Sequence, residues 1–397
     1  MNFEELFELI KNNDDCNFFA YAASIHQANS IDATIAYLES KGIKVNGYVL
    51  MVPHGTTGKV VTADKFVNSN PNIKYFDYDN SSGNCSLLKK IMAKFVFMYK
   101  NLLDNNNNYT NFYVAVRNLH YDWIYRLKKI IPKRNLYFII LEDGVGSYAD
   151  YFDNSLLFIQ RTFDNIYSLR YYYTYLRFCL GYFFEFINKK IIEKKRNLIR
   201  STIFIKKLEN DRVKLVRNKS MSRFYQDVFK KFGSKIPYEK LKIFDNCVLI
   251  NTQPLNSNNV TDGIIDFEVY QKTVDILKNL GFSVVIKPHP RELDYKKYEK
   301  LDCLVFDDNT YTQESILANV VSKPKCIISI YSSTLLNAKG IFNIPAISLA
   351  KIMLKEKIDN MFKKQLEDFI DRYKDLFFFP DTYEEMYDYL KMLKNKR

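Results

Sequence analysis

Short apolar runs alternate with segments of helical spacing over the first 141 residues of the chain. An unbroken apolar run predicts a strand buried on both faces, and an apolar residue at every third or fourth position predicts a helix with one face on a core. The pattern predicts strands at 17–21, 45–51, 111–116 and 136–141, and helices at 27–40, 86–103 and 122–130. Because strands that alternate with helices form βαβ units, the sheet is expected to be parallel.

The second half of the chain repeats this pattern. It predicts strands at 248–251, 283–286, 326–330 and 345–349, helices at 267–280 and 313–320, a helical turn at 335–339 and helices beyond 356. The whole chain is therefore expected to be an α/β protein with two Rossmann-like sheets in series and a cleft between them. Ligands of such sheets bind beyond the carboxyl ends of the strands.

Changes in the pattern divide the chain into four predicted segments. Residues 1–165 form a first Rossmann-like domain and residues 243–350 a second one. Between them lies a basic, aromatic connector at 166–242, and residues 351–397 form C-terminal helices that pack back across the domains. The length of 397 residues fits two or three domains.

The positive charge of the chain is concentrated in the connector. The chain has 58 Lys/Arg and 45 Asp/Glu, a net charge of +13, and residues 189–242 alone hold 18 Lys/Arg and five Asp/Glu. An aromatic stretch at 171–187 comes directly before the basic run 189–196. This order is typical of an amphipathic helix on an anionic membrane surface, and the charge also suits a track for an acidic polymer. A solvated helix with its apolar side on the core explains the same pattern, so all three interpretations stay open.

Composition narrows the class of protein. With 47% hydrophobic and 26% charged residues, the sequence is that of a globular protein. No apolar run reaches the ~18 residues of a membrane span, and the first residues lack the basic region and apolar core of a signal peptide. Six scattered cysteines predict reduced thiols. We therefore expect a cytoplasmic protein. We expect neither a nucleic-acid partner nor a metal site, because the sequence contains no known nucleic-acid-binding motif and no set of His, Cys and carboxylate residues with the spacing of metal ligands.

The first candidate cluster is Glu142-Asp143-Gly144, directly after the strand predicted at 136–141. Two adjacent carboxylates at the end of a strand suit a general base that faces a cleft, because like charge and partial burial raise the pKa of one of them. A helix N-cap or a turn explains the same residues, since Asp-Gly is a common turn pair.

The second cluster follows the strand predicted at 283–286. His289 stands between Pro288 and Pro290, with Lys287 and Arg291 on either side. The prolines stiffen the backbone, and an imidazole between two cations can donate to a phosphate oxygen. We favour this function over that of a rigid loop.

The third cluster, Ser332, Ser333 and Thr334, precedes the helical turn at 335–339. Hydroxyls and free N–H groups at a helix N-terminus can bind an anion, although Ser and Thr also cap ordinary helices. Other signals are weaker. Residues 55–59 lack the spacing of a P-loop. We expect His26, His54 and His120 to be structural, although His26 follows the first strand, where it can line the cleft.

In this order, the three clusters resemble the motifs of bacterial sialyltransferases: an acidic pair with Gly, a His-Pro pair and a Ser-Ser/Thr pair. The resemblance is nearest to the capsular polysialyltransferases, with the lipooligosaccharide sialyltransferases next. It implies a GT-B fold, in which the two Rossmann-like domains face a central cleft. It also implies CMP-sialic acid as the donor and no metal or other cofactor.

The resemblance assigns roles to single residues. Glu142 is the general base that takes the proton of the acceptor hydroxyl, with Asp143 as its partner or substitute, and His289 stabilises the CMP phosphate as it leaves. The donor site further includes Gly144, Lys287, Pro290, Ser332, Ser333 and Thr334, with Glu314 at the ribose or cytosine. On this basis the first domain carries the base and the acceptor side, and the second binds the CMP-sugar.

The expected reaction is inverting transfer of sialic acid from CMP-Neu5Ac to a terminal hydroxyl of sialic acid or galactose, in a bacterial capsule or lipooligosaccharide. The expected partners are this donor, an acidic or galactose-terminated glycan and the anionic inner face of the bacterial inner membrane. Two alternatives remain. One is a transferase for another CMP-activated ulosonic acid, such as Kdo or legionaminic acid, and the other is a non-catalytic cationic scaffold that binds a polyanion or a membrane.

Overall fold

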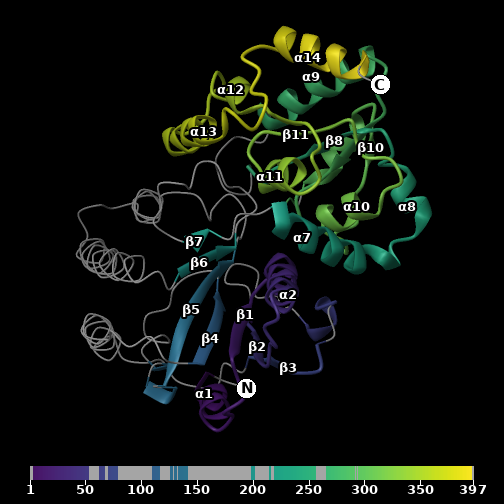
Figure 1. The fold of residues 1–397 in the computed structure, drawn as a ribbon. Coiled ribbons are helices and arrows are strands. Elements are labelled where there is room, and N and C mark those ends of the chain that lie inside the picture. The colour runs from purple at the N-terminus through teal and green to yellow at the C-terminus, as the bar shows by residue number, and fades with distance from the viewer. Residues whose placement is uncertain are drawn as a thin grey trace. The chain divides into compact units, whose positions relative to one another are not determined.

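The structure is a computed structural model of the chain, drawn in Figure 1. It describes residues 3–52, 62–67, 70–78, 110–116, 126–127, 129–131, 133–141, 198–201, 214–215, 219–255, 265–290, 292 and 294–395. The chain forms two compact units, Met1–Val228 and Phe229–Arg397, and each unit has its own parallel sheet.

The sheet of the first unit has seven strands in the order β3-β2-β1-β4-β5-β6-β7, all paired in parallel. The strands are β1 (Phe18–Ala22), β2 (Gly47–Met51), β3 (Ile73–Asp77), β4 (Thr110–Val116), β5 (Arg134–Leu141), β6 (Leu198–Ser201) and β7 (Lys214–Leu215). Its helices are α1 (Phe3–Lys11), α2 (Ile25–Ser40) and the 3-10 helix η1 (Ala63–Lys65), and α7 (Lys219–Phe232) begins in this unit and ends in the next.

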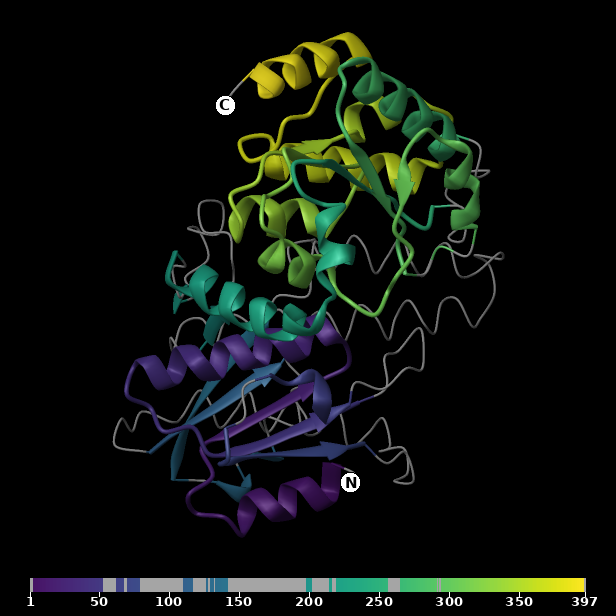
Figure 2. The ribbon, with the colours of Figure 1, turned by 90° about the vertical axis from the view of Figure 1, so that its right-hand side faces the viewer.

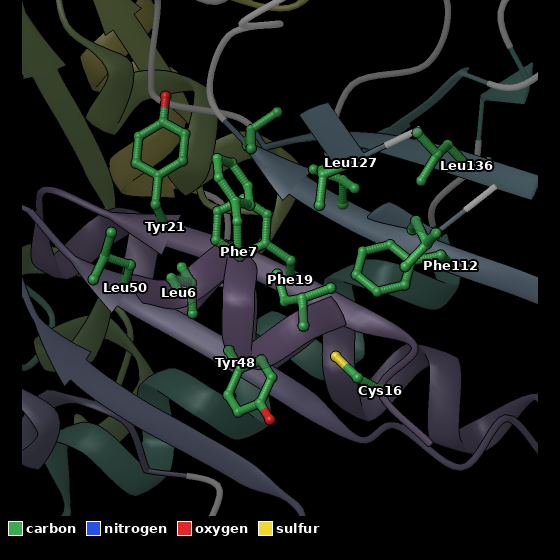
Figure 3. Packing of buried hydrophobic residues seen from close by; sticks show 14 residues of the cluster. Leu6, Phe7, Cys16, Phe19, Tyr21, Tyr48, Leu50, Phe112, Leu127 and Leu136 are labelled. Atoms are coloured by element: carbon green, nitrogen blue, oxygen red, sulfur yellow. The ribbon is translucent and has the colours of Figure 1, made fainter. Parts of the chain in front are cut away.

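Both faces of the central strand β1 are covered, as its unbroken apolar sequence predicts. All five residues of β1 are buried, and successive side chains point to opposite faces of the sheet. Phe19 packs with Phe7 of α1, their ring centroids 6.4 Å apart, in the cluster of Figure 3. Phe18, on the other face, belongs to a second cluster with Ala28 and Ile31 of α2. Figure 2 shows α1 and α2 on opposite faces of this sheet.

The second unit has a five-stranded sheet in the order β10-β9-β8-β11-β12, again all parallel. The strands are β8 (Val248–Asn251), β9 (Val284–Lys287), β10 (Leu304–Val305), β11 (Cys326–Ser329) and β12 (Ala346–Ser348). The helices are α8 (Tyr238–Lys242), α9 (Ile265–Asn279), α10 (Gln313–Asn319), α11 (Ser333–Gly340), α12 (Ala350–Met353), α13 (Asn360–Tyr373) and α14 (Tyr383–Asn395), with the 3-10 helices η3 (Gly233–Lys235) and η5 (Tyr295–Lys300). Here β8 occupies the centre, between β9 and β11.

The prediction of two parallel α/β sheets in series is confirmed. Two α/β domains, each with its own parallel sheet, are what the expected GT-B fold requires. The sequence pattern did not predict α1, β3 or the two-residue strand β10. The helix predicted at 86–103 lies outside the described residues. Of the six cysteines, the four that the structure describes have free thiols.

Part of the basic connector is ordinary core structure. The strands β6 and β7 extend the first sheet beyond residue 165. In α7, Tyr225 is buried and the ring of Phe224 meets Tyr37 of α2 edge-on, whereas Lys230 is exposed. The interpretation as a helix with its apolar side on the core therefore holds for α7. The aromatic and basic run at 171–196 lies outside the described residues.

The division between the units falls at residues 228 and 229, inside the predicted connector 166–242. The C-terminal helices of segment 351–397 belong to the second unit, where α14 contacts α9 and α13 contacts α12. Whether they also reach the first domain stays a prediction. Among the helices that the structure describes, none is long and apolar enough to cross a membrane.

Two glycines of the first unit give a test of the sheet packing. Gly47 of β2 pairs with Phe18 of β1, and a Cβ at Gly47 would overlap the carbonyl oxygen of Phe18. Gly42 has a positive φ of 76° but nothing within 4 Å of a Cβ. We expect Gly42→Ala to cost about 1 kcal/mol through backbone strain and Gly47→Ala to cost about 3 kcal/mol or more, because the strands must move apart.

Thermal and urea unfolding of the two variants measure this difference. Equal losses of stability, or a larger loss for Gly42→Ala, would contradict the close approach of β1 and β2.

Candidate functional site

The predicted residues of the second unit meet at the carboxyl edge of its sheet. The strands β9, β8 and β11 are neighbours, and they end at Lys287, Asn251 and Ser329. Because parallel strands deliver their carboxyl ends to one edge, the loops that follow these strands lie side by side. Two of the predicted clusters, around His289 and Ser332, are in these loops.

The loop after β9 is bound to the end of β8. The main-chain N–H of His289 donates to the hydroxyl of Thr252, 3.1 Å away, and the N–H of Thr252 donates to the carbonyl of Lys287 at 3.4 Å. The loop then turns at Pro290, and the N–H of Glu292 donates to the carbonyl of His289 at 2.8 Å. Proline at the second position of such a turn presets its backbone. The position of His289 is therefore set by both strands.

The loop after β11 is bound to the same end of β8. The amide of Asn251 donates to the hydroxyl of Thr334 at 2.7 Å. The hydroxyl of Ser332 caps α11, because it accepts from the N–H of Thr334 at 3.2 Å, and it lies 2.9 Å from the Thr334 hydroxyl. The capping interpretation of this cluster thus holds for Ser332. Ser333 opens the helix and is partly exposed.

Glu314 extends the group through the helices α10 and α11. It lies in the first turn of α10, which Thr312 caps, and its carboxylate accepts from the amide of Asn337 at 2.7 Å. Asn337 is one turn beyond Thr334 on α11, so both residues lie on one face of the helix. Glu314 is nearly buried, at 7% exposed. The family resemblance proposed Glu314 without indicating this partner.

Lys287, the last residue of β9, is buried with its ammonium group among acidic residues. The ammonium donates to the carbonyl of Asp308 at 3.3 Å and lies 5.4 Å from the ring centre of Phe306. Burial lowers the pKa of Lys287 to about 8, and the carboxylates of Glu314 and Asp308 oppose this shift because they favour the charged form. Lys287 and Glu314 are therefore close enough to share one electrostatic environment.

A buried polar network supports the His289 loop from behind. The hydroxyl of Thr252 donates to one carboxylate oxygen of Glu292, and the hydroxyl of Tyr298 donates to the other at 2.7 Å. The ammonium of Lys297 lies 3.0 Å from Asp266 and 3.6 Å from Glu292. Burial raises the pKa of Glu292, and its hydrogen bonds with Thr252 and Tyr298 oppose the shift.

Hydrogen bonds and neighbouring positions thus link the predicted residues of the second unit around the end of β8. Sequence reasoning missed Asn251, Thr252 and Asn337, and it gave Glu292 no role. Asn251 and Thr252 carried a usable signal, because they are polar residues directly after a buried strand. Asn337 gave none, since an Asn inside a predicted helical turn is commonplace.

The predicted general base lies outside the described residues, as do Asp143, Gly144 and Arg291. The structure ends β5 at the buried Leu141, and Glu142 is the next residue in the sequence. The weak P-loop match at 55–59 is also outside. His26 lies in the first turn of α2, and its buried Nε2 has no hydrogen-bond partner among the residues that the structure describes.

The chemistry of the edge suits an anion. The loop that carries His289, a lysine that is cationic below about pH 8 and the N-terminus of α11 with its hydroxyls all lie at this edge. In the part of the chain that the structure describes, no three His, Cys, Asp or Glu residues lie close enough to hold a metal ion. Glu314 adds an acceptor suited to hydroxyl or amino groups.

Several solved structures are similar to the chain over nearly its full length. A putative UDP-N-acetylglucosamine 2-epimerase from Listeria monocytogenes is 13% identical, with 96% of this chain and 88% of that chain covered and a TM-score of 0.48. Arabidopsis thaliana UGT89C1, solved with UDP-L-rhamnose, is 9% identical, with coverage of 95% and 88% and a TM-score of 0.46. The Methanocaldococcus jannaschii UDP-GlcNAc 2-epimerase is 11% identical, with coverage of 96% and 92% and a TM-score of 0.43. Scores this low assign no activity to the chain.

No curated protein matches the sequence. A family model does match, and it is that of the alpha-2,8-polysialyltransferases (POLYST), over residues 65–351. The match covers more than half of the chain and includes strands of both sheets. The chain therefore belongs to the alpha-2,8-polysialyltransferase family, and it is a glycosyltransferase that takes a nucleotide-sugar donor and a glycan acceptor.

Proposed function

We propose that the chain transfers sialic acid from CMP-Neu5Ac to a terminal hydroxyl of sialic acid or galactose, in a bacterial capsule or lipooligosaccharide. The family supports sialyl transfer in general. The observation that carries the specific proposal is the shared attachment of the His289 and Ser332 loops to the end of β8. This attachment holds an imidazole and a capped helix N-terminus at one edge, where a single phosphate can bind.

In this proposal the second unit binds the donor. The imidazole of His289 and the ammonium of Lys287 stabilise the charge that grows on the CMP phosphate as it leaves. The loop of Pro290 and the hydroxyls of Ser332, Ser333 and Thr334 complete the phosphate site. Glu314 accepts from the ribose hydroxyls or the cytosine amine. CMP carries one phosphate, so these donors can replace a divalent metal ion, and we propose a metal-independent reaction.

The first unit supplies the base. Glu142, which follows the last residue of β5, takes the proton from the acceptor hydroxyl, with Asp143 as its partner or substitute and Gly144 as part of the donor site. The hydroxyl oxygen attacks the anomeric carbon from the face opposite the phosphate, and the bond to the phosphate oxygen breaks. One displacement of this kind inverts the anomeric centre. We further propose that the basic connector holds the enzyme on the inner face of the bacterial inner membrane.

The first prediction concerns the base. We expect Glu142→Gln to lower the rate of transfer at least 100-fold, because loss of general-base catalysis costs 10²- to 10⁴-fold in typical enzymes. CMP affinity should stay within twofold of that of the native protein, since in the proposal Glu142 acts on the acceptor hydroxyl and residues of the second unit bind the phosphate. Transfer assays and isothermal titration with CMP measure the two effects, and a fully active variant would exclude Glu142 as the base.

The second prediction concerns the donor and metal ions. Among CMP-Neu5Ac, CMP-Kdo and a UDP-sugar, we expect turnover with CMP-Neu5Ac, at the same rate with and without EDTA. Release of CMP and formation of sialylated acceptor are both measured. A preference for CMP-Kdo would support the alternative ulosonic-acid transferase. No turnover with any donor, combined with salt-sensitive polyanion binding, would support the non-catalytic scaffold.

The third prediction is a pH dependence caused by Lys287. Its pKa of about 8 leaves the amine charged at pH 7 and neutral at pH 9.5, whereas the CMP phosphate is a dianion throughout, with its second pKa near ~6. Affinity for CMP should therefore begin to fall near pH 8 and lose roughly tenfold, the value of a charge-assisted hydrogen bond. Binding is measured by calorimetry from pH 7 to pH 10.

Lys287→Arg serves as the control, because its guanidinium stays charged over this range and should remove the fall near pH 8. An unchanged pH profile in Lys287→Met would show that another group titrates.

A further inference from the structure

The main chain of His289 lies beyond the last ladder pair of its strand. The parallel pairing of β9 with β8 ends with Lys287 opposite Asn251, two residues before His289. The sheet therefore does not fix the peptide that carries the imidazole. A side chain fixes it, because the N–H of His289 donates to the hydroxyl of Thr252.

Thr252 can hold this position only because its hydroxyl is itself held. A hydroxyl accepts and donates at once, and Thr252 donates its proton to the carboxylate of Glu292. Thr252 is 1% exposed, so water does not compete for either bond. Because the hydroxyl proton of Thr252 points toward Glu292, a lone pair of the hydroxyl oxygen is free to accept from the N–H of His289.

Glu292 is fixed from three sides. Its N–H closes the turn to the carbonyl of His289, its second oxygen accepts from Tyr298, and Lys297 lies 3.6 Å away. Tyr298 is fully buried, and Glu292 is 8% exposed. Burying a carboxylate is costly unless hydrogen bonds and a cation compensate, and both are present here. A network of this kind costs desolvation free energy, and in return its directional hydrogen bonds hold the Thr252 hydroxyl in one orientation.

We propose that Thr252 and Glu292 are positioning residues for His289. They determine where its imidazole stands at the carboxyl edge of the sheet, and neither of them touches the donor. This proposal rests on the proposed function, in which His289 binds the donor phosphate.

A double-mutant cycle in the full chain tests the proposal, with CMP as the ligand and calorimetry as the readout. We expect His289→Ala to weaken CMP binding about tenfold, and Thr252→Val to weaken it about tenfold as well, since each removes one charge-assisted or positioning hydrogen bond. In the His289→Ala background, Thr252→Val should change CMP affinity less than twofold. A residue that acts through His289 has no effect once the imidazole is gone.

Two further variants separate positioning from stability. Thr252→Ser keeps the hydroxyl and should bind CMP within about threefold of the native affinity. Thr273→Val is the matched control, because Thr273 is also buried in this unit but its hydroxyl donates only within its own helix, to the carbonyl of Val269. It should lower the thermal midpoint without a change in CMP affinity.

The outcomes are distinct. Equal losses of affinity from Thr252→Val with and without His289, or no loss at all, would overturn the positioning role. If His289→Ala alone leaves CMP affinity unchanged, the proposed function fails at His289 itself. Should Thr252→Val not fold, Glu292→Gln takes its place, because the amide leaves one of the two hydroxyls without an oxygen acceptor. It should show the same dependence on His289, and an effect independent of His289 would refute the proposal.

Discussion

The end of a parallel strand leaves the next loop without ladder hydrogen bonds, and in the second unit the central strand supplies them from side chains. Asn251 and Thr252 stand next to each other at the end of β8, between β9 and β11. Thr252 accepts from the N–H of His289 after β9, and Asn251 donates to Thr334 after β11. Two adjacent residues thereby set the distance between the imidazole loop and the N-terminus of α11. Every role proposed for this edge depends on that spacing.

This arrangement requires polar groups to be buried, and their cost shapes the surroundings. Glu292 and Asp266 are both nearly inaccessible, and the ammonium of Lys297 lies within 3.6 Å of both carboxylates. Apolar residues of the same size would be at least as stabilising in many proteins. Hydrogen bonds, however, have direction, so the polar network fixes the orientation of Thr252 as packing alone does not. Burial of Glu292 and Asp266 thus costs desolvation free energy behind the site, and the hydrogen bonds of the network fix the position of the His289 loop at its surface.

The sequence was sufficient for the strands that position the site. The strand predicted at 248–251 is observed with the same bounds, and the strands before His289 and Ser332 are displaced by one residue at most. This succeeds because a buried parallel strand is an unbroken apolar run, whatever its neighbours are. Such runs also locate the carboxyl edge, so the two clusters of the second unit were found together.

The sequence could not predict the role of a residue where that role depends on which strands are neighbours in the sheet. The role of Thr252 follows from the pairing of β8 with β9 and β11, and local periodicity contains no information on strand order. Local periodicity also could not predict the hydrogen bond between Asn337 and Glu314, because the two residues are 23 positions apart and lie on different helices. In α7, by contrast, charge was an ambiguous signal. The positive charge of the connector left a membrane surface and an ordinary solvated helix open, and the buried Tyr225 shows that α7 contributes to a core.

The structural support of the site extends beyond the residues that define the family. The family match ends at residue 351, before α13 and α14. Yet Tyr331, which directly precedes Ser332, packs its ring on Phe369 of α13, with 4.8 Å between the centroids. The segment after α13 also pairs with the edge strand β12, where the N–H of Ser348 donates to the carbonyl of Phe378 at 2.9 Å.

An exposed sheet edge is prone to pair with other chains, and this segment covers it. Phe378 is in turn stacked on Tyr389 of α14, with ring centroids 4.0 Å apart. The ring contacts of Tyr331 with Phe369 continue to Phe377 and Phe379, the neighbours of Phe378 in this segment. Because Tyr331 fixes the chain immediately before the capped N-terminus of α11, α13 constrains the α11 side of this edge as the β8 residues constrain the His289 loop. The site therefore depends on a longer stretch of sequence than its motifs, and a variant confined to α13 can alter it without changing any residue of those motifs.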